Sequence, residues 1–261
     1  ALNVVPVATR DWNVQMGFTG TFQSTIFTKL SNTTDPNYEI QTGNLETVRF
    51  DFPQVHRVGY APYTWNLWQQ LYDANGNPIQ NAVVDRNGDG VINNDDKYLV
   101  TDSKGKPVKP APDFFYGITF KAQYKNWDFG FNGHGSVGNW LFNDTYASHS
   151  TTFADVNYVY LPNFLRTVYQ SGFHAENKTV QSMSDMFLED ASFFRLDDVN
   201  LGYTFGFRHN KSSMRIALSA QNVFVLTKYS GIDPEASGVG GIDRSLWPRP
   251  RIFTLKMGLN F

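Results

Sequence analysis

Residues 253–261 alternate between apolar and polar side chains. Every odd position is apolar, and the positions between them carry a threonine, a lysine, a glycine and an asparagine. Because successive side chains of a strand point to opposite faces, this segment predicts a strand with one apolar and one polar face. The aromatic residue at its end, Phe261, is typical of strands that finish a β-barrel of the bacterial outer membrane.

The same alternation recurs in five earlier segments, each close to the length that a tilted strand needs to cross the hydrocarbon layer. Their opposite faces are mostly small, polar or charged, as a water-filled lumen requires. A soluble β-sandwich uses shorter strands and larger core residues, so we predict an all-β chain that forms about six strands of a transmembrane antiparallel β-barrel. The five segments are 12–23, 114–124, 127–137, 198–205 and 214–221.

The composition agrees with strands that cross a membrane. The chain of 261 residues is 41% hydrophobic and 16% aromatic, and it has no apolar run of about 18 residues, as a spanning helix would need. Aromatic residues are enriched at both surfaces of a membrane, and Trp12, Tyr124 and Trp127 lie at predicted strand ends. The net charge of −2 gives no reason to expect nucleic acid, and the absence of cysteine excludes a disulfide framework.

Short and long connections alternate along the predicted strands. The connections at 125–126 and 207–213 are short, whereas those at 24–113, 138–192 and 227–250 are long. Outer-membrane barrels place short turns in the periplasm and long loops outside, so we expect the long connections to form an extracellular structure.

Six strands are too few to enclose a polar lumen. Residues 1–6 also lack the basic segment and the apolar stretch of a signal peptide. We therefore expect residues 1–261 to be the carboxy-terminal portion of a larger barrel, with the remainder of the same barrel outside this chain.

Residues 85–96 have the ligand spacing of a twelve-residue calcium loop. Calcium takes hard oxygen donors around a sharp turn, here at Gly90, and we expect Ile92 to anchor the loop by packing. Aspartate replaces the usual glutamate at the last position. The alternative is a turn-rich surface loop held by hydrogen bonds of its Asx side chains. The candidate ligands of a structural calcium ion are Asp85, Asn87, Asp89, the carbonyl group of Val91, Asn93 and Asp96.

Aromatic residues gather in the first two long connections. Aromatic rings stack on sugar rings, so these residues are candidates for contact with a ligand. The alternative, which we favour, is that they pack the loops together or form the interface with a partner lipoprotein. The candidates are Tyr63, Trp65, Trp68, Tyr146, Tyr158 and Tyr160.

The sequence does not show the pattern of an enzyme. Its five histidines, at 56, 134, 149, 174 and 209, are scattered over predicted strands and loops, and no G-x-S-x-G motif accompanies them. We expect His134, on the polar face of its strand, to be a solvated polar residue and not a catalytic base.

Motifs that follow one another along the chain resemble the SusC/RagA family of TonB-dependent outer-membrane transporters. The loop at 85–96 is followed by P-A-P-D-F-F-Y-G at 110–117 and by E-D-A-S-F-F-R-L-D-D-V-N-L-G-Y-T at 189–204. The segment S-A-Q-N-V-F-V-L-T-K-Y-S-G-I-D-P-E lies at 219–235, and P-R-P-R lies at 248–251. The chain departs from the family pattern at 104–109, which lengthens the link after the loop.

The resemblance implies the last strands of a barrel of about 22 strands, filled by a plug that lies outside this chain. Such transporters lie in the outer membrane of Gram-negative, Bacteroides-type bacteria, in contact with membrane lipid. They import oligosaccharides, glycans above all, or peptides, with energy from the TonB complex, which acts through the amino-terminal part. A SusD-like lipoprotein caps their outer face. The alternative function is a passive outer-membrane porin, which needs neither plug nor TonB.

Overall fold

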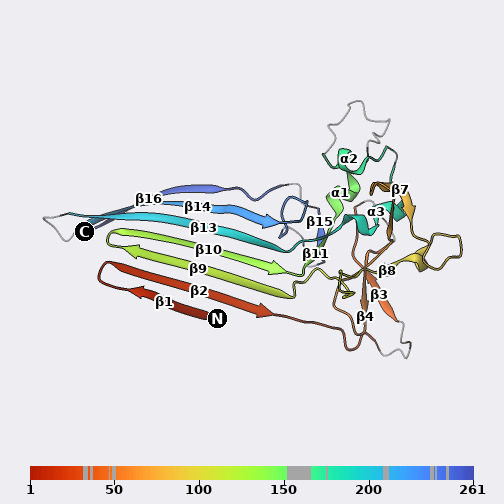
Figure 1. The fold of residues 1–261 in the computed structure, drawn as a ribbon, viewed down its shortest axis with the longest axis horizontal. Coiled ribbons are helices and arrows are strands. Elements are labelled where there is room, and N and C mark those ends of the chain that lie inside the picture. The colour runs from red at the N-terminus through yellow and green to blue at the C-terminus, as the bar shows by residue number, and fades with distance from the viewer. Residues whose placement is uncertain are drawn as a thin grey trace.

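The computed structural model describes residues 1–31, 35, 38–46, 48, 51–151, 166–174, 176–207, 212–235, 238, 240–244 and 247–261. These residues form two parts: a long antiparallel sheet, and a folded unit at one end of that sheet (Figure 1). We call the second part the loop unit. It consists of the described residues of the three long connections, 24–113, 138–192 and 228–250.

The sheet contains seven strands, and all six strands predicted from the alternating pattern are among them. The order across the sheet is β1-β2-β9-β10-β13-β14-β16, so each long strand pairs with the long strands before and after it in the chain. This meander is the arrangement of an antiparallel barrel wall. The bounds are β1 Leu2–Ala8, β2 Trp12–Phe22, β9 Phe114–Tyr124, β10 Trp127–Val137, β13 Phe193–Gly206, β14 Ser213–Thr227 and β16 Ile252–Asn260.

The sheet has one strand more than the pattern predicts, because β1 pairs with β2 along one edge. The apolar residues of β1 change phase between Val4 and Val5. Its pairing register shifts between Val4 and Val7, a stretch that contains Pro6, which has no backbone donor. The alternation of apolar and polar residues is therefore broken within β1, and for that reason the sequence pattern does not predict this strand.

β13 and β14 are longer than the segments predicted for them, 198–205 and 214–221, because the two strands contain a bulge. The pairing shifts between Leu196 and Asp198, and on β14 it passes over Asn222, whose backbone φ of 51° is left-handed. An extra residue moves the side chains beyond it to the other face. On β13 the apolar positions change from even to odd at the bulge. On β14 Asn222 interrupts a run of even apolar positions that resumes at Phe224 and Leu226, so both predicted segments end there although the strands continue.

The short connections lie at the end of the sheet away from the loop unit (Figure 1). β1 and β2 join through residues 9–11, and β9 and β10 join through residues 125–126. The two turns touch, because the N–H group of Lys125 donates a hydrogen bond to the carbonyl oxygen of Asp11 at 2.8 Å. The predicted alternation of short and long connections is confirmed.

The loop unit holds three small sheets and several short helices. The sheets have the orders β3-β4-β5-β8, β6-β7 and β12-β11-β15. None of the helices in the described part of the chain is long and apolar enough to cross a membrane. The strands are β3 Glu39–Thr42, β4 Gln54–Arg57, β5 Thr64–Leu67, β6 Gln70–Tyr72, β7 Pro78–Val83, β8 Tyr98–Leu99, β11 Trp140–Asn143, β12 Leu188–Asp190 and β15 Ile242–Asp243. The α-helices are α1 Asp144–Ser148, α2 Arg166–Ser171 and α3 Thr179–Ser182, and the 3-10 helices are η1 Asn94–Asp96 and η2 Asp185–Phe187.

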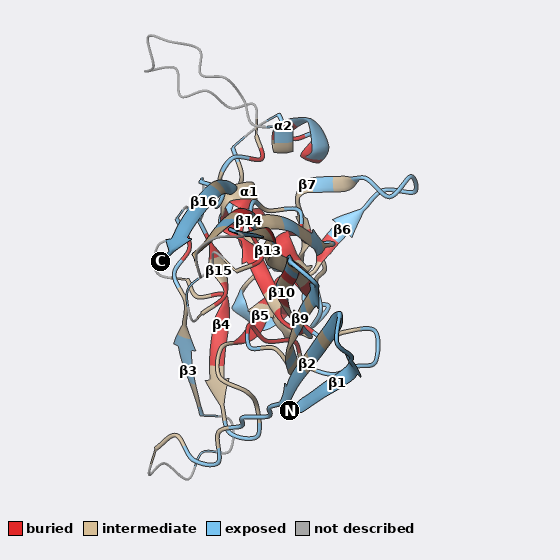
Figure 2. Cartoon of the chain, turned by 90° about the vertical axis from the view of Figure 1, so that its left-hand side faces the viewer, coloured by how far each residue is buried: buried red, intermediate tan, exposed pale blue. Residues whose placement is uncertain are grey.

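The main hydrophobic core of the described residues lies in the loop unit. Trp65, Leu67 and Phe142 are fully buried there, and burial of each such side chain contributes about 1.5–3 kcal/mol. The sheet instead exposes large apolar side chains, such as Phe253 at 78% and Leu255 at 68%. Figure 2 shows the contrast between red β4 in the loop unit and pale blue β16 in the sheet. An exposed apolar face is what a lipid-facing wall requires.

Candidate functional site: the two faces of the sheet and the loop unit

One face of the sheet is apolar and carries two belts of aromatic residues. Within each belt, rings on neighbouring strands lie against each other with centroids 4.4 to 4.7 Å apart, and Tyr116 of β9 and Phe194 of β13 lie 6.3 Å apart across β10. The prediction that aromatic residues line both ends of the strands is confirmed. The belt near the loop unit contains Phe22, Phe114, Tyr116 and Phe194, and the belt at the turn end contains Trp12, Tyr124, Trp127 and Tyr203.

The spacing of the belts matches the thickness of a membrane. Phe114 and Tyr124 are the first and last residues of β9, an 11-residue strand. Their separation along the strand is ~33 Å at ~3.3 Å per residue. A strand tilt of about 40° reduces this distance to about 25 Å across the membrane, which is the height of the apolar band on an outer-membrane barrel. The apolar face is therefore the lipid-facing surface.

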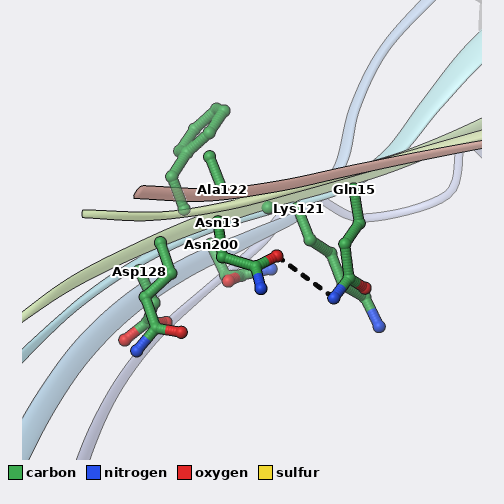
Figure 3. A pocket seen from close by; sticks show the side chains of 9 residues that line it. Asn13, Gln15, Lys121, Ala122, Asp128 and Asn200 are labelled. Carbon is green, nitrogen blue, oxygen red and sulfur yellow. Dashed lines mark hydrogen bonds between the residues drawn. The ribbon is translucent and has the colours of Figure 1, made fainter. Parts of the chain in front are cut away.

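The opposite face is polar and is the candidate lumenal surface. Asn13 and Gln15 of β2, Lys121 of β9 and Asn200 of β13 help to line a hollow of about 280 Å³ (Figure 3). The side-chain amide of Gln15 donates a hydrogen bond from Nε2 to Oδ1 of Asn13 at 3.3 Å. Amides offer donors and acceptors without net charge. This face therefore suits water or a polar solute and not lipid.

An ion pair ties three strands together on the polar face. Arg215 of β14 reaches across β13 to Asp128 of β10, and its Nε donates to Oδ2 at 2.9 Å. Gly202 of β13 lies beneath the pair, and a Cβ added to it would lie 2.5 Å from the Oδ2 atom of Asp128. The glycine therefore leaves room for the pair. The two side chains are 43% and 33% exposed, so we expect the pair to contribute less than about 1 kcal/mol.

Arg195 of β13 holds the third long connection against the polar face. Its guanidinium donates from Nε to Glu235 Oε2 and from Nη2 to Asp233 Oδ1, each at 2.6 Å, and it also bonds to Asn222. Arg249 adds a second cation at 3.2 Å from each of the same two carboxylates. The side chains of Arg195 and Asp233 are each 4% exposed. This cluster, which sequence reasoning did not find, is a buried anchor.

His134 lies on the polar face with its side chain 38% exposed, as expected of a polar residue, and it also bridges two carboxylates, which the sequence did not indicate. Its Nδ1 lies 2.7 Å from Asp197 Oδ2, and its Nε2 lies 2.8 Å from Glu235 Oε1. Counting by twos from Val199 would place Asp197 on the lipid-facing surface. The bulge turns Asp197 to the polar face. The alternating pattern therefore gave no sign of this contact.

The third long connection also binds the other two. Gln54 of β4 donates from Nε2 to the carbonyl oxygen of Gly240 at 2.6 Å. Arg244 donates from Nε to Asp144 Oδ2 at 2.7 Å, and the same oxygen accepts the N–H group of Glu46 at 2.9 Å. In addition, β15 pairs in parallel with β11. The three connections are therefore one folded unit and not three independent loops.

The aromatic candidates of the loop unit differ in exposure. Trp65 and Trp68 are 0% and 3% exposed and lie in the core, where the rings of Trp65 and Phe142 are 5.9 Å apart. Tyr146 is partly buried against the same core. Tyr63 lines a hollow of about 160 Å³ beside the start of the first long connection. Burial of the two tryptophans supports the interpretation that they pack the loops together. Tyr158 and Tyr160, as well as His209, lie outside the described residues.

The predicted calcium loop is a turn in which carboxylates accept backbone N–H groups. Asp85 accepts the N–H group of Gly90 at 2.8 Å, and Asp96 accepts those of Asn93 at 2.8 Å and Arg86 at 2.9 Å. Asp96 is fully buried, yet its pKa is lowered, first by the N–H group of Asn93 and against the effect of burial. Each carboxylate oxygen has a second lone pair. The two oxygens of Asp85 each accept one backbone N–H group and so can take a cation, whereas Oδ1 of Asp96 accepts a second N–H group, from Asn87 at 3.4 Å.

The other candidate ligands are bonded in the same way. Asn87 accepts the N–H group of Asp89 at 3.0 Å, and Asp89 accepts that of Val91 at 2.7 Å. Ile92 is 40% exposed, so the expectation that it anchors the loop is wrong, and buried Asp96 takes that part. Within the described residues, no group of three or more His, Cys, Asp or Glu side chains is arranged to hold a metal ion. The calcium site stays a prediction.

A partly buried carboxylate, Asp185, lies beside this loop. It accepts the hydroxyl group of Tyr98 at 2.6 Å and the N–H group of Gln70 at 2.9 Å. Burial raises the pKa of Asp185, and the two hydrogen bonds oppose that rise. The guanidinium of Arg86 lies 4.6 Å from the centroid of the Tyr98 ring. The loop at 85–96 is therefore fixed to the rest of the loop unit by packing on this cluster.

Curated relatives of the chain are TonB-dependent receptors, although no family model matches it. The chain is 34% identical over 270 residues to the TonB-dependent receptor SusC of Bacteroides thetaiotaomicron, and the match covers 100% of the chain and 26% of SusC. It is 28% identical over 224 residues to a TonB-dependent receptor of Formosa agariphila, covering 76% of the chain and 22% of that receptor. The chain thus spans about a quarter of the length of these relatives.

Solved structures share the fold. The structure of the RagAB peptide transporter superposes with a TM-score of 0.67 at 17% identity, over 98% of this chain and 28% of the other. The "open-open" state of the RagAB peptide importer gives a TM-score of 0.64 at 18% identity, over 99% and 28%. These superpositions show that the chain shares the fold of the corresponding part of both structures.

Proposed function

Because the chain is SusC/RagA-like along its whole length, we propose that it is part of an outer-membrane importer that takes up oligosaccharides or peptides with energy supplied through TonB. The observation that carries the proposal is a sheet with one lipid-facing and one polar surface, topped by a single folded unit. We place glycans first, as the resemblance of the motifs implies. The peptide transport named for RagAB belongs to a protein 17% identical to this chain, which supports the fold and not the cargo.

We propose that the rest of the barrel comes from strands outside this chain. In the described part, β1 and β16 each pair on one side only, and unpaired backbone groups in the hydrocarbon layer cost several kcal/mol each. Seven strands also cannot enclose a polar lumen. A barrel of about 22 strands with a plug is the arrangement that the resemblance implies. Residues 1–261 then supply its carboxy-terminal portion, with 24–113 as an extracellular connection.

Uptake by cells that carry the full-length gene tests this function. Labelled oligosaccharides and labelled peptides are supplied separately to cells with TonB and to cells without it. We expect uptake of one cargo class and its loss in the absence of TonB. Uptake that continues unchanged without TonB would identify a passive porin instead.

We propose that a SusD-like lipoprotein covers the loop unit. The unit exposes apolar and aromatic side chains, among them Tyr169 of α2 at 81% and Val58 at 47%, and exposed surface of this kind marks contact sites. Trp65 and Trp68 are buried, so surface residues such as these would make the contact. A pull-down from native outer membranes in mild detergent should recover the lipoprotein. Recovery of the transporter alone, with full import activity, would contradict the proposal.

We also propose that residues 85–96 bind one calcium ion in a structural role. Calorimetry on the full-length protein, after removal of divalent cations by a chelator, should show heat of calcium binding. Asp85→Ala and Asp89→Ala should each weaken the binding about tenfold or more, because each removes a charged oxygen ligand.

A matched control for the calcium test is Asp102→Ala. Asp102 accepts two backbone N–H groups of its own turn at 2.9 Å each, but it lies outside the loop at 85–96. We expect this variant to bind calcium like the parent protein. Equal heats in all the proteins, or no heat in any of them, would leave a turn held by its Asx side chains alone.

A further inference from the structure

The lipid-facing surface carries a hollow of about 420 Å³ at the end near the loop unit. Apolar side chains from three strands form much of its wall, where Ser136, Phe193 and Thr227 also lie, and its rim is polar. The hollow therefore combines apolar surface with one cation and one anion. The wall contains Tyr116 of β9, Val137 of β10 and Leu226 of β14, and the rim contains Asp190, Ser192 and Lys228.

Glycines on the lipid-facing side of β10 shape this part of the surface. A Cβ added to Gly135 would lie 2.7 Å from atoms of the Tyr116 ring, and one added to Gly133 would lie 2.8 Å from the Phe194 ring. The two rings lie in nearly parallel planes, with 4° between them. They therefore lie close over the backbone of β10, where a larger side chain would displace them.

The position of the hollow indicates what fills it. Tyr116 belongs to the aromatic belt near the loop unit, the level at which acyl chains give way to headgroups. Val137 and Leu226 are 48% and 61% exposed. The strands that carry the wall, β9, β10 and β14, are inner strands of the sheet, so further barrel strands at β1 and β16 would not cover it. Membrane lipid is therefore the natural occupant.

The polar rim suits a headgroup that has both a phosphate and hydrogen-bond donors. Lys228 is exposed and has no carboxylate partner among the described residues. Asp190 accepts the N–H group of Ser192 at 2.9 Å and its hydroxyl group at 2.6 Å, both at Oδ1. A phosphate would pair with Lys228, and an amide or hydroxyl donor of the same molecule would bond to Oδ2 of Asp190.

We propose that this hollow binds lipopolysaccharide through its lipid A part, with an acyl chain against Val137 and Leu226 and a phosphate on Lys228. Lipid A supplies the chemistry that the hollow requires: phosphates, amide and hydroxyl donors, and several acyl chains. The inference rests on the proposed function in one respect, the orientation that places the loop unit on the outer side of the membrane. Lipopolysaccharide forms the outer leaflet of the outer membrane, which is the leaflet on that side.

Native mass spectrometry of the full-length transporter in mild detergent tests the proposal. Lipid A is added to delipidated protein, with diacylglycerol and phosphatidylethanolamine as comparison lipids. We expect one bound lipid A per transporter and about tenfold weaker binding in Lys228→Gln. Val137→Phe, which fills the hollow without changing charge, should also weaken binding. Lys104→Gln, at an exposed lysine of the loop unit outside the hollow, should bind like the parent protein.

Three results would overturn the proposal. The first is equal affinity of Lys228→Gln and the parent protein for lipid A. The second is binding of diacylglycerol as tight as that of lipid A, which would remove the headgroup contact. The third is tighter binding of phosphatidylethanolamine, which would assign the hollow to a phospholipid. Cargo uptake by the same variants is measured separately, and normal uptake alongside any of these results leaves the proposed import function intact.

Discussion

Replacing Arg195 by methionine is expected to lower the free energy of unfolding of the loop unit by about 3–5 kcal/mol. Methionine keeps an unbranched apolar stem but removes the cation that faces Asp233 and Glu235. The Asp233 side chain is 4% exposed and that of Glu235 is 21% exposed, so water solvates the remaining charges poorly. Arg249 lies 3.2 Å from both carboxylates and compensates only in part.

Hydrogen exchange of the full-length protein in detergent micelles measures this effect where it arises. Amides at 229–235 and 240–244 should exchange faster in Arg195→Met, because the anchor of the third long connection is lost, whereas amides of the β9 and β10 ladder should not change. Arg215→Met is the matched control. It removes an arginine from the same polar face, but from a pair whose side chains are 43% and 33% exposed, and it should cost less than about 1 kcal/mol.

A rescue variant separates charge from packing at this anchor. Adding Asp233→Asn and Glu235→Gln to Arg195→Met removes the buried charges that methionine leaves unpaired, so part of the stability should return. If the triple variant is as unstable as the single one, the arginine acts through packing alone. Equal losses in Arg195→Met and Arg215→Met would contradict the idea of a buried anchor.

Met257→Arg is expected to reduce the stability of the barrel by about 2–4 kcal/mol. Met257 lies near the middle of β16, opposite Ile216, and is 66% exposed on the lipid-facing surface. An arginine at this depth must either enter the hydrocarbon layer or extend along the strand to reach a headgroup. Urea-dependent folding of the full-length protein into lipid vesicles measures the loss.

The neighbouring residue supplies the control for this prediction. Gly258 points to the polar face, and a Cβ added there meets no atom within 4 Å in the described structure. Gly258→Ser should therefore change stability by no more than about 0.5 kcal/mol. Equal effects at the two positions would contradict the assignment of one face to lipid and the other to the lumen.

The long strands are predictable from the sequence because lipid and water act on alternate residues. Lipid on one face and water on the other act along the whole of β2, β9, β10 and β16, and the alternating pattern predicts all four strands. The prediction from the pattern fails where the backbone interrupts the alternation, near Pro6 of β1 and at the bulge that includes Asp197. The adjacent aspartates at 197 and 198 are the local sign of that bulge, since a regular strand would turn one of them toward lipid.

The candidate site is less predictable, because its contacts join distant parts of the chain. Local spacing identifies the loop at 85–96 but does not reveal that Asp96 is its buried residue. Arg195 and Glu235 both lie in segments that resemble the transporter family, yet nothing in a separation of 40 residues indicates a contact. That contact depends on how β13 pairs with β14 and on the return of the third connection over the polar face. The pattern of single strands contains neither fact.

The joining of the three long connections has a consequence for the order of folding. The bond between Gln54 and Gly240 links residues 186 apart in the sequence, and Arg244 bonds to the carbonyl oxygen of Asn44 across 200 residues. Contacts of such long range form slowly, because the chain between them must first be ordered. These two contacts are therefore expected to form late. The core around Trp65 comes from the first two connections, and only Ile242 of the third packs against it among the described residues. The third connection is therefore expected to close over a core that the first two have already begun to form, and exposed apolar surface before that step favours aggregation.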